Sequence, residues 1–380
     1  MKHLLRFALL SALLLLVACN DREKSSFANR EALYEPRYAT GFRILSYDGN
    51  SSILQVINPW QGAQGVVKNI FLARIGEPAP TPFDGVVVKV PATRLVCMSS
   101  SYVAFLDALD QTDAVVGVSG AGFITNPRIR ERTATGMIAD VGFDTNLDFE
   151  QIASLKPDAV LLFGVTDENE PIANKLNELG IPSIYIGDYM EYDPLGKAEW
   201  LVAVGEICGE REKAQSRFDS IAAAYEAYKQ RAATVARRPE VMLNAPFRDV
   251  WFVPGDSSYM VRLLEDAGGN YVCRGEPSRI SRPISGETAF LATQKADYWL
   301  NPNQFTSLEE LIRENPRYAA VLAIKNGRVW NNNKITTPEG GSDFWESGVV
   351  RADLVLRDLI AILHPELDIA DSLIYYRPLH

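Results

Sequence analysis

The stretch from Glu210 to Ala233 contains neither Gly nor Pro, and it constrains the fold more than any other part of the chain. Its apolar residues recur every three or four positions, which is the spacing of one buried helix face. That face comprises Ala214, Phe218, Ile221, Ala222, Tyr225 and Ala232. A helix of this length would exceed ~30 Å, about the width of a domain. The sequence therefore predicts one long helix that Pro239 closes.

On both sides of this helix, short apolar strands alternate with amphipathic helices. Alternation with nearly continuous apolar strands is typical of an α/β lobe built on a parallel sheet. The predicted fold class is therefore α/β, with two Rossmann-like α/β lobes joined by one long interlobe helix and a small β-rich N-terminal extension. The expected boundaries are 86–207 for the N-terminal lobe, 208–236 for the interlobe helix and 237–380 for the C-terminal lobe.

The first residues predict export. Lys2 and Arg6 precede an apolar run that is shorter than the ~20 residues needed to span a bilayer. Residues 1–18 therefore read as a secretory signal peptide. The sequence Leu-Val-Ala-Cys that ends at Cys19 resembles the lipobox of bacterial lipoproteins, which implies lipidation of Cys19 and anchoring in the membrane.

Two short regions follow the signal. Residues 19–40 are polar and lack periodicity, which predicts a flexible tether. Residues 41–85 contain short β-type runs separated by Gly, Asn and Ser, which predicts a β-rich extension. The sequence assigns this extension no role.

Charge and cysteine content exclude some classes of function. Without Lys2 and Arg6 the chain keeps 36 basic residues against 48 acidic ones, a net charge of −12. Such a chain repels phosphates, so we expect no nucleic-acid partner. Cys97, Cys208 and Cys273 are far apart in sequence and have no metal-type spacing, and whether two of them pair stays open.

One pattern occurs twice. The stretches 146–164 and 285–303 each contain a Glu, a short amphipathic run, a Lys, an Asp and an apolar strand. The Glu are Glu150 and Glu287, placed eight residues before Asp158 and ten residues before Asp297, respectively. The longer spacing predicts a longer helix, or a displaced Glu, in the second copy. Each Glu would also suit the first turn of a helix, where the macrodipole favours an acid.

The pattern points to a known family. The segments RLVCMSSSYVAFLDALD, NLDFEQIASLKPDAVLLFG, GDSSYMVRLLEDAGGN and KADYWLN, placed around a long helix and behind a lipobox, resemble the periplasmic substrate-binding proteins of ABC importers for iron–siderophores, haem and cobalamin. The resemblance implies a monomer in the periplasm that catalyses nothing. It also implies that Glu150 and Glu287 dock into Arg pockets of an ABC permease dimer, which works with its ATPase subunits.

Ligand sites in open α/β sheets form at the carboxyl ends of strands. Arg beside Trp and Tyr in such loops suits a large, flat, partly anionic ligand. The candidate ligand-binding residues are Ser100, Ser101, Tyr102, Ser119, Phe123, Phe247, Arg248, Trp251, Tyr259, Arg279, Arg282 and Trp345.

The small number of histidines limits the class of solute that the protein can bind. Only His364 and His380 follow the signal peptide, too few for the His-rich sites that hold a bare metal ion. We therefore expect no protein-bound metal and no cofactor; a metal would arrive inside a chelate. A haem ligand would be Tyr102, Tyr259 or Met98. An iron chelate, siderophore or haem, is the predicted solute, with cobalamin as the alternative.

Two other classes stay as alternatives. The segment from Gly117 to Ala121 nearly matches the nucleophile elbow G-x-S-x-G, with Ser119 as nucleophile, but a hydrolase needs a His base and His364 is followed by Pro. A sensor or scaffold lipoprotein would need neither docking Glu.

Overall fold

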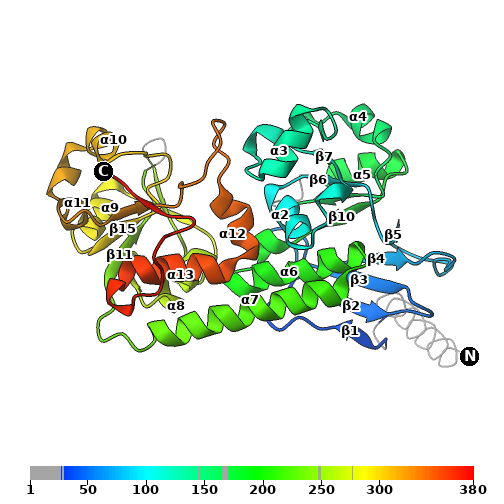
Figure 1. Ribbon diagram of the computed structural model, residues 1–380, viewed down its shortest axis with the longest axis horizontal. Coiled ribbons are helices and arrows are strands. Elements are labelled where there is room, and N and C mark those ends of the chain that lie inside the picture. Colours follow the sequence, from blue (N-terminus) through cyan, green and yellow to red (C-terminus); the bar gives the residue numbers. More distant parts are fainter. Residues whose placement is uncertain (1–26, 28–29, 144–145, 165–169, 247–249, 276) are drawn as a thin grey trace, which may run out of the picture.

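The computed structural model describes residues 27, 30–143, 146–164, 170–246, 250–275 and 277–380. Two α/β lobes stand side by side on helices that run beneath both (Figure 1). The longest, α7 (Arg211–Ala232), spans about 33 Å at 1.5 Å per residue. Its buried residues are Ala214, Phe218, Ile221, Ala222, Tyr225 and Ala232. The long interlobe helix is confirmed, with the predicted face inward.

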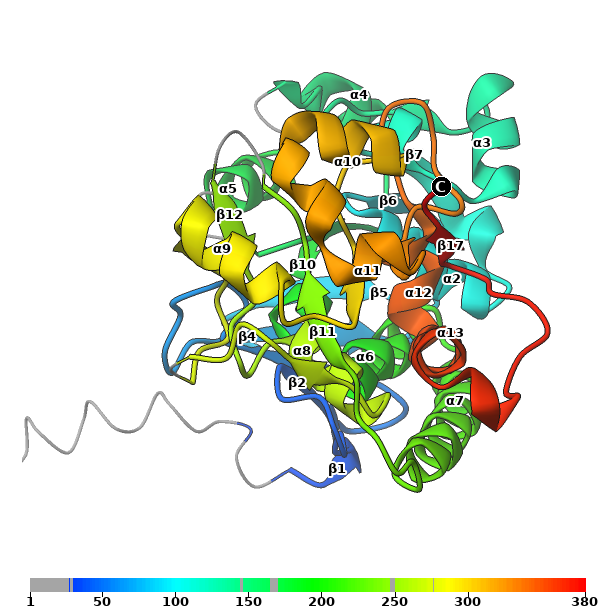
Figure 2. The same cartoon turned by 90° about the vertical axis from the view of Figure 1, so that its left-hand side faces the viewer.

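Two further helices pack along α7. Helix α6 (Pro194–Ile207) is buried at every position, and α13 (Ala352–Leu363) comes from the C-terminal end of the chain. Because α6 follows the N-lobe in sequence and α13 belongs to the C-lobe, α7 ties both lobes to one helical base. In the side view of Figure 2 the C-lobe lies in front of the N-lobe, with this base below.

The N-lobe contains a parallel five-stranded sheet in the order β10-β9-β6-β7-β8. Its strands are β6 (Leu95–Cys97), β7 (Val115–Val118), β8 (Ala139–Asp140), β9 (Ala159–Leu162) and β10 (Ser183–Tyr185). Its helices are α2 (Ser100–Ala108), α3 (Pro127–Ala134), α4 (Phe149–Ser154) and α5 (Glu170–Glu178).

The C-lobe repeats this plan with one antiparallel edge strand. Its sheet has the order β13-β11-β15-β16-β17, and only β17 runs antiparallel to its neighbour. The strands are β11 (Glu240–Leu243), β13 (Asn270–Tyr271), β15 (Tyr298–Leu300), β16 (Val329–Asn331) and β17 (Arg377–Pro378), and β12 (Trp251–Val253) pairs with β14 (Arg282–Ile284). The remaining helices are α8 (Tyr259–Asp266), α9 (Gly286–Thr293), α10 (Leu308–Glu314), α11 (Leu322–Lys325) and α12 (Ser347–Val350).

The repeated sequence pattern has the same structural role in both lobes. Asp158 leads into β9, and its Oδ2 accepts the backbone N–H groups of Thr93 and Arg94 just before β6. Asp297 leads into β15, and its Oδ2 accepts the N–H of Glu240 at the start of β11. Each Asp thus fastens the incoming strand to a neighbouring strand of the same sheet, β9 to β6 and β15 to β11. The extra spacing in the second copy is a longer helix, because α9 has eight residues and α4 has six.

A third sheet precedes the lobes. Its order is β1-β2-β3-β4-β5, antiparallel except for the last pair. The strands are β1 (Ala32–Tyr34), β2 (Phe42–Ser46), β3 (Ser52–Ile57), β4 (Val67–Ala73) and β5 (Val86–Lys89). Regular structure therefore begins earlier than the sequence predicts. Residues 30–40, expected in the tether, include β1, and several of them donate hydrogen bonds to Glu199 of α6.

We call the contacts of residues 34–41 with α6 and the loop before it the brace. The Glu199 carboxylate, fully buried on α6, accepts the Tyr34 hydroxyl at 2.7 Å. It also accepts the N–H groups of Arg37, Tyr38 and Ala39 at 2.7–2.8 Å. Glu191, just before α6, accepts the N–H groups of Thr40 and Gly41, both at 2.8 Å. The brace fixes the third sheet to the helical base.

Cys97, Cys208 and Cys273 are buried free thiols, so the open question of a disulfide is answered for them. Within the described ranges, no helix is long and apolar enough to cross a membrane. The signal peptide and Cys19 lie outside the described residues.

Candidate ligand-binding face between the lobes

Aromatic rings and cations from both halves meet above α6. From the C-lobe, Tyr259 begins α8, and its ring centre lies 5.3 Å from Nζ of Lys197 on α6. The ring of Tyr189, in the loop after β10, lies 5.9 Å from the same nitrogen. Trp345 packs against Tyr259 with ring centres 6.5 Å apart. The C-lobe therefore meets the N-lobe through aromatic faces gathered around one ammonium group.

A second cation lies beside this group. The Arg279 guanidinium carbon lies 3.4 Å above the ring of Tyr192, in the loop just before α6. Nearby, Arg262 of α8 pairs with Asp193, the N-cap residue of α6, at 3.0 Å. We call Tyr189, Tyr192, Lys197, Tyr259, Arg279 and Trp345 the interlobe face.

Polar contacts below the face hold the lysine. Lys197 Nζ donates to the Asp188 carbonyl oxygen at 2.7 Å, and both residues are buried. Burial lowers the pKa of Lys197, an effect that the charges of Asp188 and Glu191 oppose. Burial raises the pKa of Asp188, whereas Lys197 and a hydrogen bond from Ser101 oppose it. The lysine is held in place at the bottom of the face.

Three of the predicted ligand residues belong to this face: Tyr259, Arg279 and Trp345. Trp345 is 48% exposed and Arg279 is exposed, so both side chains are accessible to a solute. Ser100 and Ser101 begin α2, where Ser101 supports Asp188. Ser119 is buried at the end of β7, and its N–H donates to the Cys97 carbonyl.

Tyr102, predicted as a ligand residue, lies in the core of the N-lobe. Its side chain is fully buried, and its hydroxyl donates to the carbonyl oxygens of Leu162 and Ile186, both at 3.1 Å. Tyr102 therefore joins the ends of β9 and β10 from within the N-lobe core. Tyr102 and Met98, two of the residues expected to serve a haem, are thus both buried.

Trp251 and Arg282 also differ from the prediction. Trp251 is buried on β12, stacks on Trp299 and donates its indole N–H to the Leu243 carbonyl. Arg282 donates to the Cys273 carbonyl at 2.8 Å and so ties β14 to the chain after β13. Both residues lie on strands, β12 and β14, rather than in loops at the carboxyl ends of strands, and their side chains make contacts within the C-lobe.

Phe123 is 41% exposed, but it packs against Phe143, with ring centres 5.5 Å apart, rather than against the interlobe face. Phe247 and Arg248 lie outside the described residues.

Tyr189, Tyr192 and Lys197 are not among the ligand residues predicted from the sequence. The first two lie in the loop after β10, and the rule that ligand sites form at strand ends would have pointed to that loop as well. Lys197 had its own signal, because it is the one basic residue of a mostly apolar helix.

Comparison with known proteins identifies the family. Residues 95–334 match the family model described as periplasmic binding protein. The chain belongs to the periplasmic binding protein family. An uncharacterized lipoprotein of Methanocaldococcus jannaschii is 27% identical over 87% of this chain and 82% of its own length.

Solved structures share the fold of this binding protein. A periplasmic heme binding protein of Pseudomonas aeruginosa has a TM-score of 0.57 and 18% identity, covering 76% of this chain and 98% of its own. The periplasmic vitamin B12 binding protein of Vibrio cholerae has a TM-score of 0.54 and 15% identity, covering 73% of this chain and 98% of its own.

The two glutamates of the repeated pattern have equivalent places in their lobes but differ in their ion pairing. Glu150 lies in the first turn of α4 after the N-cap Asp148, and it is exposed. Glu287 lies in the first turn of α9 after the N-cap Ser285, also exposed, and it pairs with Arg317 at 2.8 Å. Arg317 lowers the pKa of Glu287 through hydrogen bonding and charge. The C-lobe carboxylate is thus already paired within the chain.

The residues needed for metal or hydrolytic chemistry are not gathered here. Among the residues with described positions, no three His, Cys, Asp or Glu side chains form a metal-binding group. His364 is buried at the end of α13, where it contacts the Gly268 carbonyl and Glu366. Ser119 ends a strand of the other lobe, so the two residues of the hydrolase alternative belong to different lobes.

Proposed function

We propose that this binding protein captures an iron chelate, a siderophore or haem, at the interlobe face and delivers it to an ABC permease. The carrying observation is the gathering of four aromatic rings from both lobes, with the exposed cation of Arg279 stacked on one ring and the buried Lys197 beneath two others. Aromatic faces bury large area, and cations pair with the carboxylates or phenolates that such chelates carry.

Cobalamin is the second candidate solute. It is also large and largely planar, and the fold of this chain is shared with a B12 binding protein as well as a haem binding protein. The metal in either solute would belong to the cargo.

A titration monitored by absorbance tests the proposed site. Purified protein is titrated separately with haemin, with a ferric siderophore panel and with cyanocobalamin. We expect one of them to bind, and Trp345→Ala and Arg279→Gln each to weaken that binding at least about tenfold, the effect of losing roughly 1.4 kcal/mol. Phe252→Ala is the matched control, because Phe252 is a C-lobe aromatic, 45% exposed, outside the interlobe face. Equal losses in all three variants would refute the site.

For delivery, we propose that Glu150 and Glu287 dock into basic pockets of the permease dimer, whose ATPase subunits supply the energy. Charge-assisted pairs with Arg would orient the complex. Import assays with Glu150→Ala and Glu287→Ala should show normal solute binding and poor uptake. Normal uptake in both variants would favour the sensor or scaffold alternative.

We further propose that the protein acts as a monomer held at the membrane by lipid on Cys19, facing the periplasm. The identity of one relative as a lipoprotein supports the anchor. Replacement of Cys19 by Ser should release the protein from the membrane fraction, and retention there would contradict lipidation.

A further inference from the structure

One segment of the C-lobe crosses to the N-lobe. We call residues 337–346 the strap; it leads into α12, between the two lobes in Figure 1. The strap folds on itself, because the Gly341 N–H donates to Thr337 Oγ1 and the Thr337 N–H donates to the Gly341 carbonyl, both at 2.9 Å. Its tip lies on the N-lobe so closely that a Cβ at Gly341 would meet the Phe123 carbonyl oxygen at 2.0 Å.

Glu346 at the end of the strap makes the main polar contact between the lobes there. Its side chain is buried, with the residue 2% exposed. One carboxylate oxygen accepts the N–H of Thr125 at 2.7 Å, and the other accepts the N–H of Asn126 at 2.8 Å. The Thr125 hydroxyl donates to Asp343 of the strap at 3.2 Å. A carboxylate of one lobe thus satisfies two backbone donors of the other.

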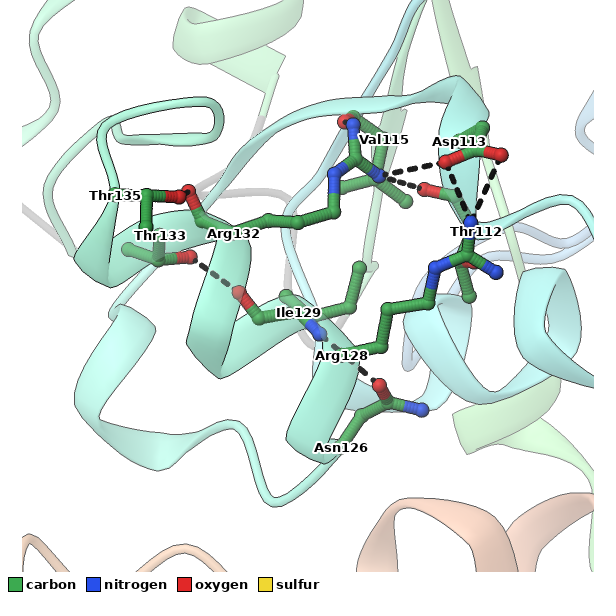
Figure 3. Close-up of polar contacts among 9 residues, drawn as sticks. All are labelled: Thr112, Asp113, Val115, Asn126, Arg128, Ile129, Arg132, Thr133 and Thr135. Atoms are coloured by element: carbon green, nitrogen blue, oxygen red, sulfur yellow. Dashed lines mark hydrogen bonds and ion pairs between the residues drawn. The ribbon is translucent and has the colours of Figure 1, made fainter.

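The N-lobe side of this contact is itself fixed (Figure 3). Asn126 caps α3, and its side chain accepts the N–H of Ile129 at 3.1 Å. Arg128 and Arg132 of α3 both reach Asp113, at 2.8 and 3.5 Å, and Arg132 also donates to the Thr112 carbonyl. Because α3 is held to the lobe at several points, the two amides that face Glu346 have a set position.

We propose that Glu346 is a positioning residue that latches the two lobes in register through the strap. The latch closes one side of the interlobe region. Opening that side breaks both hydrogen bonds and exposes the carboxylate and the two amides to water, so the latch favours the closed arrangement by the net gain of these bonds over bonds to water. The family match covers residues 95–334, so the strap lies beyond the matched region, whereas its partners Thr125 and Asn126 lie within it.

The latch also bears on the interlobe face. Trp345 is the neighbour of Glu346 in sequence, and its ring packs against Phe344 and Tyr259. When the latch is closed, Trp345 has a defined place opposite the N-lobe loop that carries Tyr189. This consequence for solute binding rests on the proposed function, whereas the latch itself does not.

Small-angle X-ray scattering of the full-length protein in detergent, without any solute, tests the latch. In Glu346→Ala we expect a larger maximum dimension and a broader distance distribution than in the unaltered protein. The matched control is Asp358→Ala. Asp358 is a buried carboxylate on α13 that also accepts two backbone N–H groups, those of Ile374 and Tyr375, each at 2.7 Å, but all within the C-lobe. That variant should melt at lower temperature with unchanged scattering below its transition.

A second variant disrupts the latch without changing Glu346. Gly341→Ala places a methyl group against the Phe123 backbone and should force the strap away from the N-lobe. Gly286→Ala is its control, because a Cβ at Gly286 meets nothing within 4 Å. The same scattering increase is expected for Gly341→Ala and none for Gly286→Ala.

The outcomes are distinct. Expansion in each folded variant of the pair Glu346→Ala and Gly341→Ala, without expansion in the controls, supports the latch. Unchanged scattering in whichever of these two variants is folded overturns it. Expansion in Asp358→Ala as well would also overturn it, because any core damage would then open the lobes. Since no solute is used, failure of the proposed function leaves this test intact.

Discussion

The brace and the latch use the same chemistry at two boundaries of the molecule, and they differ in how many donors each carboxylate serves. Glu199 in the brace accepts three successive backbone N–H groups and a Tyr hydroxyl, and it is fully buried. Glu346 in the latch accepts two backbone N–H groups and is also buried. The brace and the latch each join a segment outside the family match, which covers residues 95–334, to residues inside it.

The different number of donors at Glu199 and Glu346 indicates which of the two boundaries can open. Separating the third sheet from α6 would leave four donors and a buried carboxylate unsatisfied at Glu199 alone, with Glu191 adding more. Separating the lobes at the strap exposes a carboxylate and two amides to water, which can replace their hydrogen bonds. The brace is therefore a permanent joint, and the latch is the joint suited to capture and release of a solute.

The largest expected effect is on the brace. Glu199→Ala should lower the free energy of unfolding by about 3–5 kcal/mol, because several buried donors lose their acceptor at once. Urea unfolding measures it. Glu212→Ala, an exposed glutamate of α7, should change stability by less than about 0.5 kcal/mol. If Glu199→Ala lowered the free energy of unfolding no more than Glu212→Ala, the brace would not stabilise the fold.

Removal of the latch carboxylate comes next. Glu346→Ala should cost about 1–3 kcal/mol in the same urea experiment, less than Glu199→Ala, because its two donors become accessible to water once the lobes part. If Glu346→Ala were the more destabilising of the two, the ranking of permanent and reversible joints would be reversed.

A single hydrogen bond of the brace gives a smaller effect. Tyr34→Phe removes one of the four donors to Glu199 and keeps the ring, which stacks on Phe42. We expect a loss of about 1 kcal/mol in the urea midpoint analysis. A loss as large as that of Glu199→Ala would mean that the backbone donors contribute little.

The smallest effect is the pH response of the unaltered latch. Burial raises the pKa of Glu346 from 4.5 to about 7, and the hydrogen bonds from Thr125 and Asn126 oppose this, while the charge of Asp343 adds to it. The closed latch thus binds a proton more tightly than the open one. Its closure is strongest below pH 4.5 and weakens as the pH rises through about 7.

Scattering curves recorded between about pH 5 and pH 8 check this response. We expect the mean dimension of the unaltered chain to rise slightly with pH and that of Glu346→Gln, which does not titrate there, to stay level. The same slope in both proteins would assign the response to other groups.

Regular features of the fold could be predicted from the sequence. The apolar face of α7 repeats with helical spacing, and each residue of that face is buried. The duplicated Glu and Asp pattern marked two equivalent helix–strand units, and its spacing marked the longer second helix. The burial of one helix face and the length of a helix depend on nearby residues, so the spacing of residues along the chain is enough to predict them.

The site could be predicted only in part. Tyr259, Arg279 and Trp345 were found because aromatic and cationic residues follow strands. Tyr102 also follows a strand, yet its side chain turns inward, and Trp251, expected in a loop, lies on β12. Sequence spacing reveals neither the direction of a side chain nor this short strand. The latch joins residues more than two hundred positions apart, and nothing near Glu346 in sequence indicates that its partners are backbone amides of the other lobe.

The capture of one metal chelate between the lobes is tested most directly by native mass spectrometry of protein purified from its own source. We expect a mass above that of the bare chain by one chelate per protein, lost on denaturation and absent from Trp345→Ala purified the same way. A bare chain that also fails to take up haemin, ferric siderophores and cobalamin when these are added would contradict it.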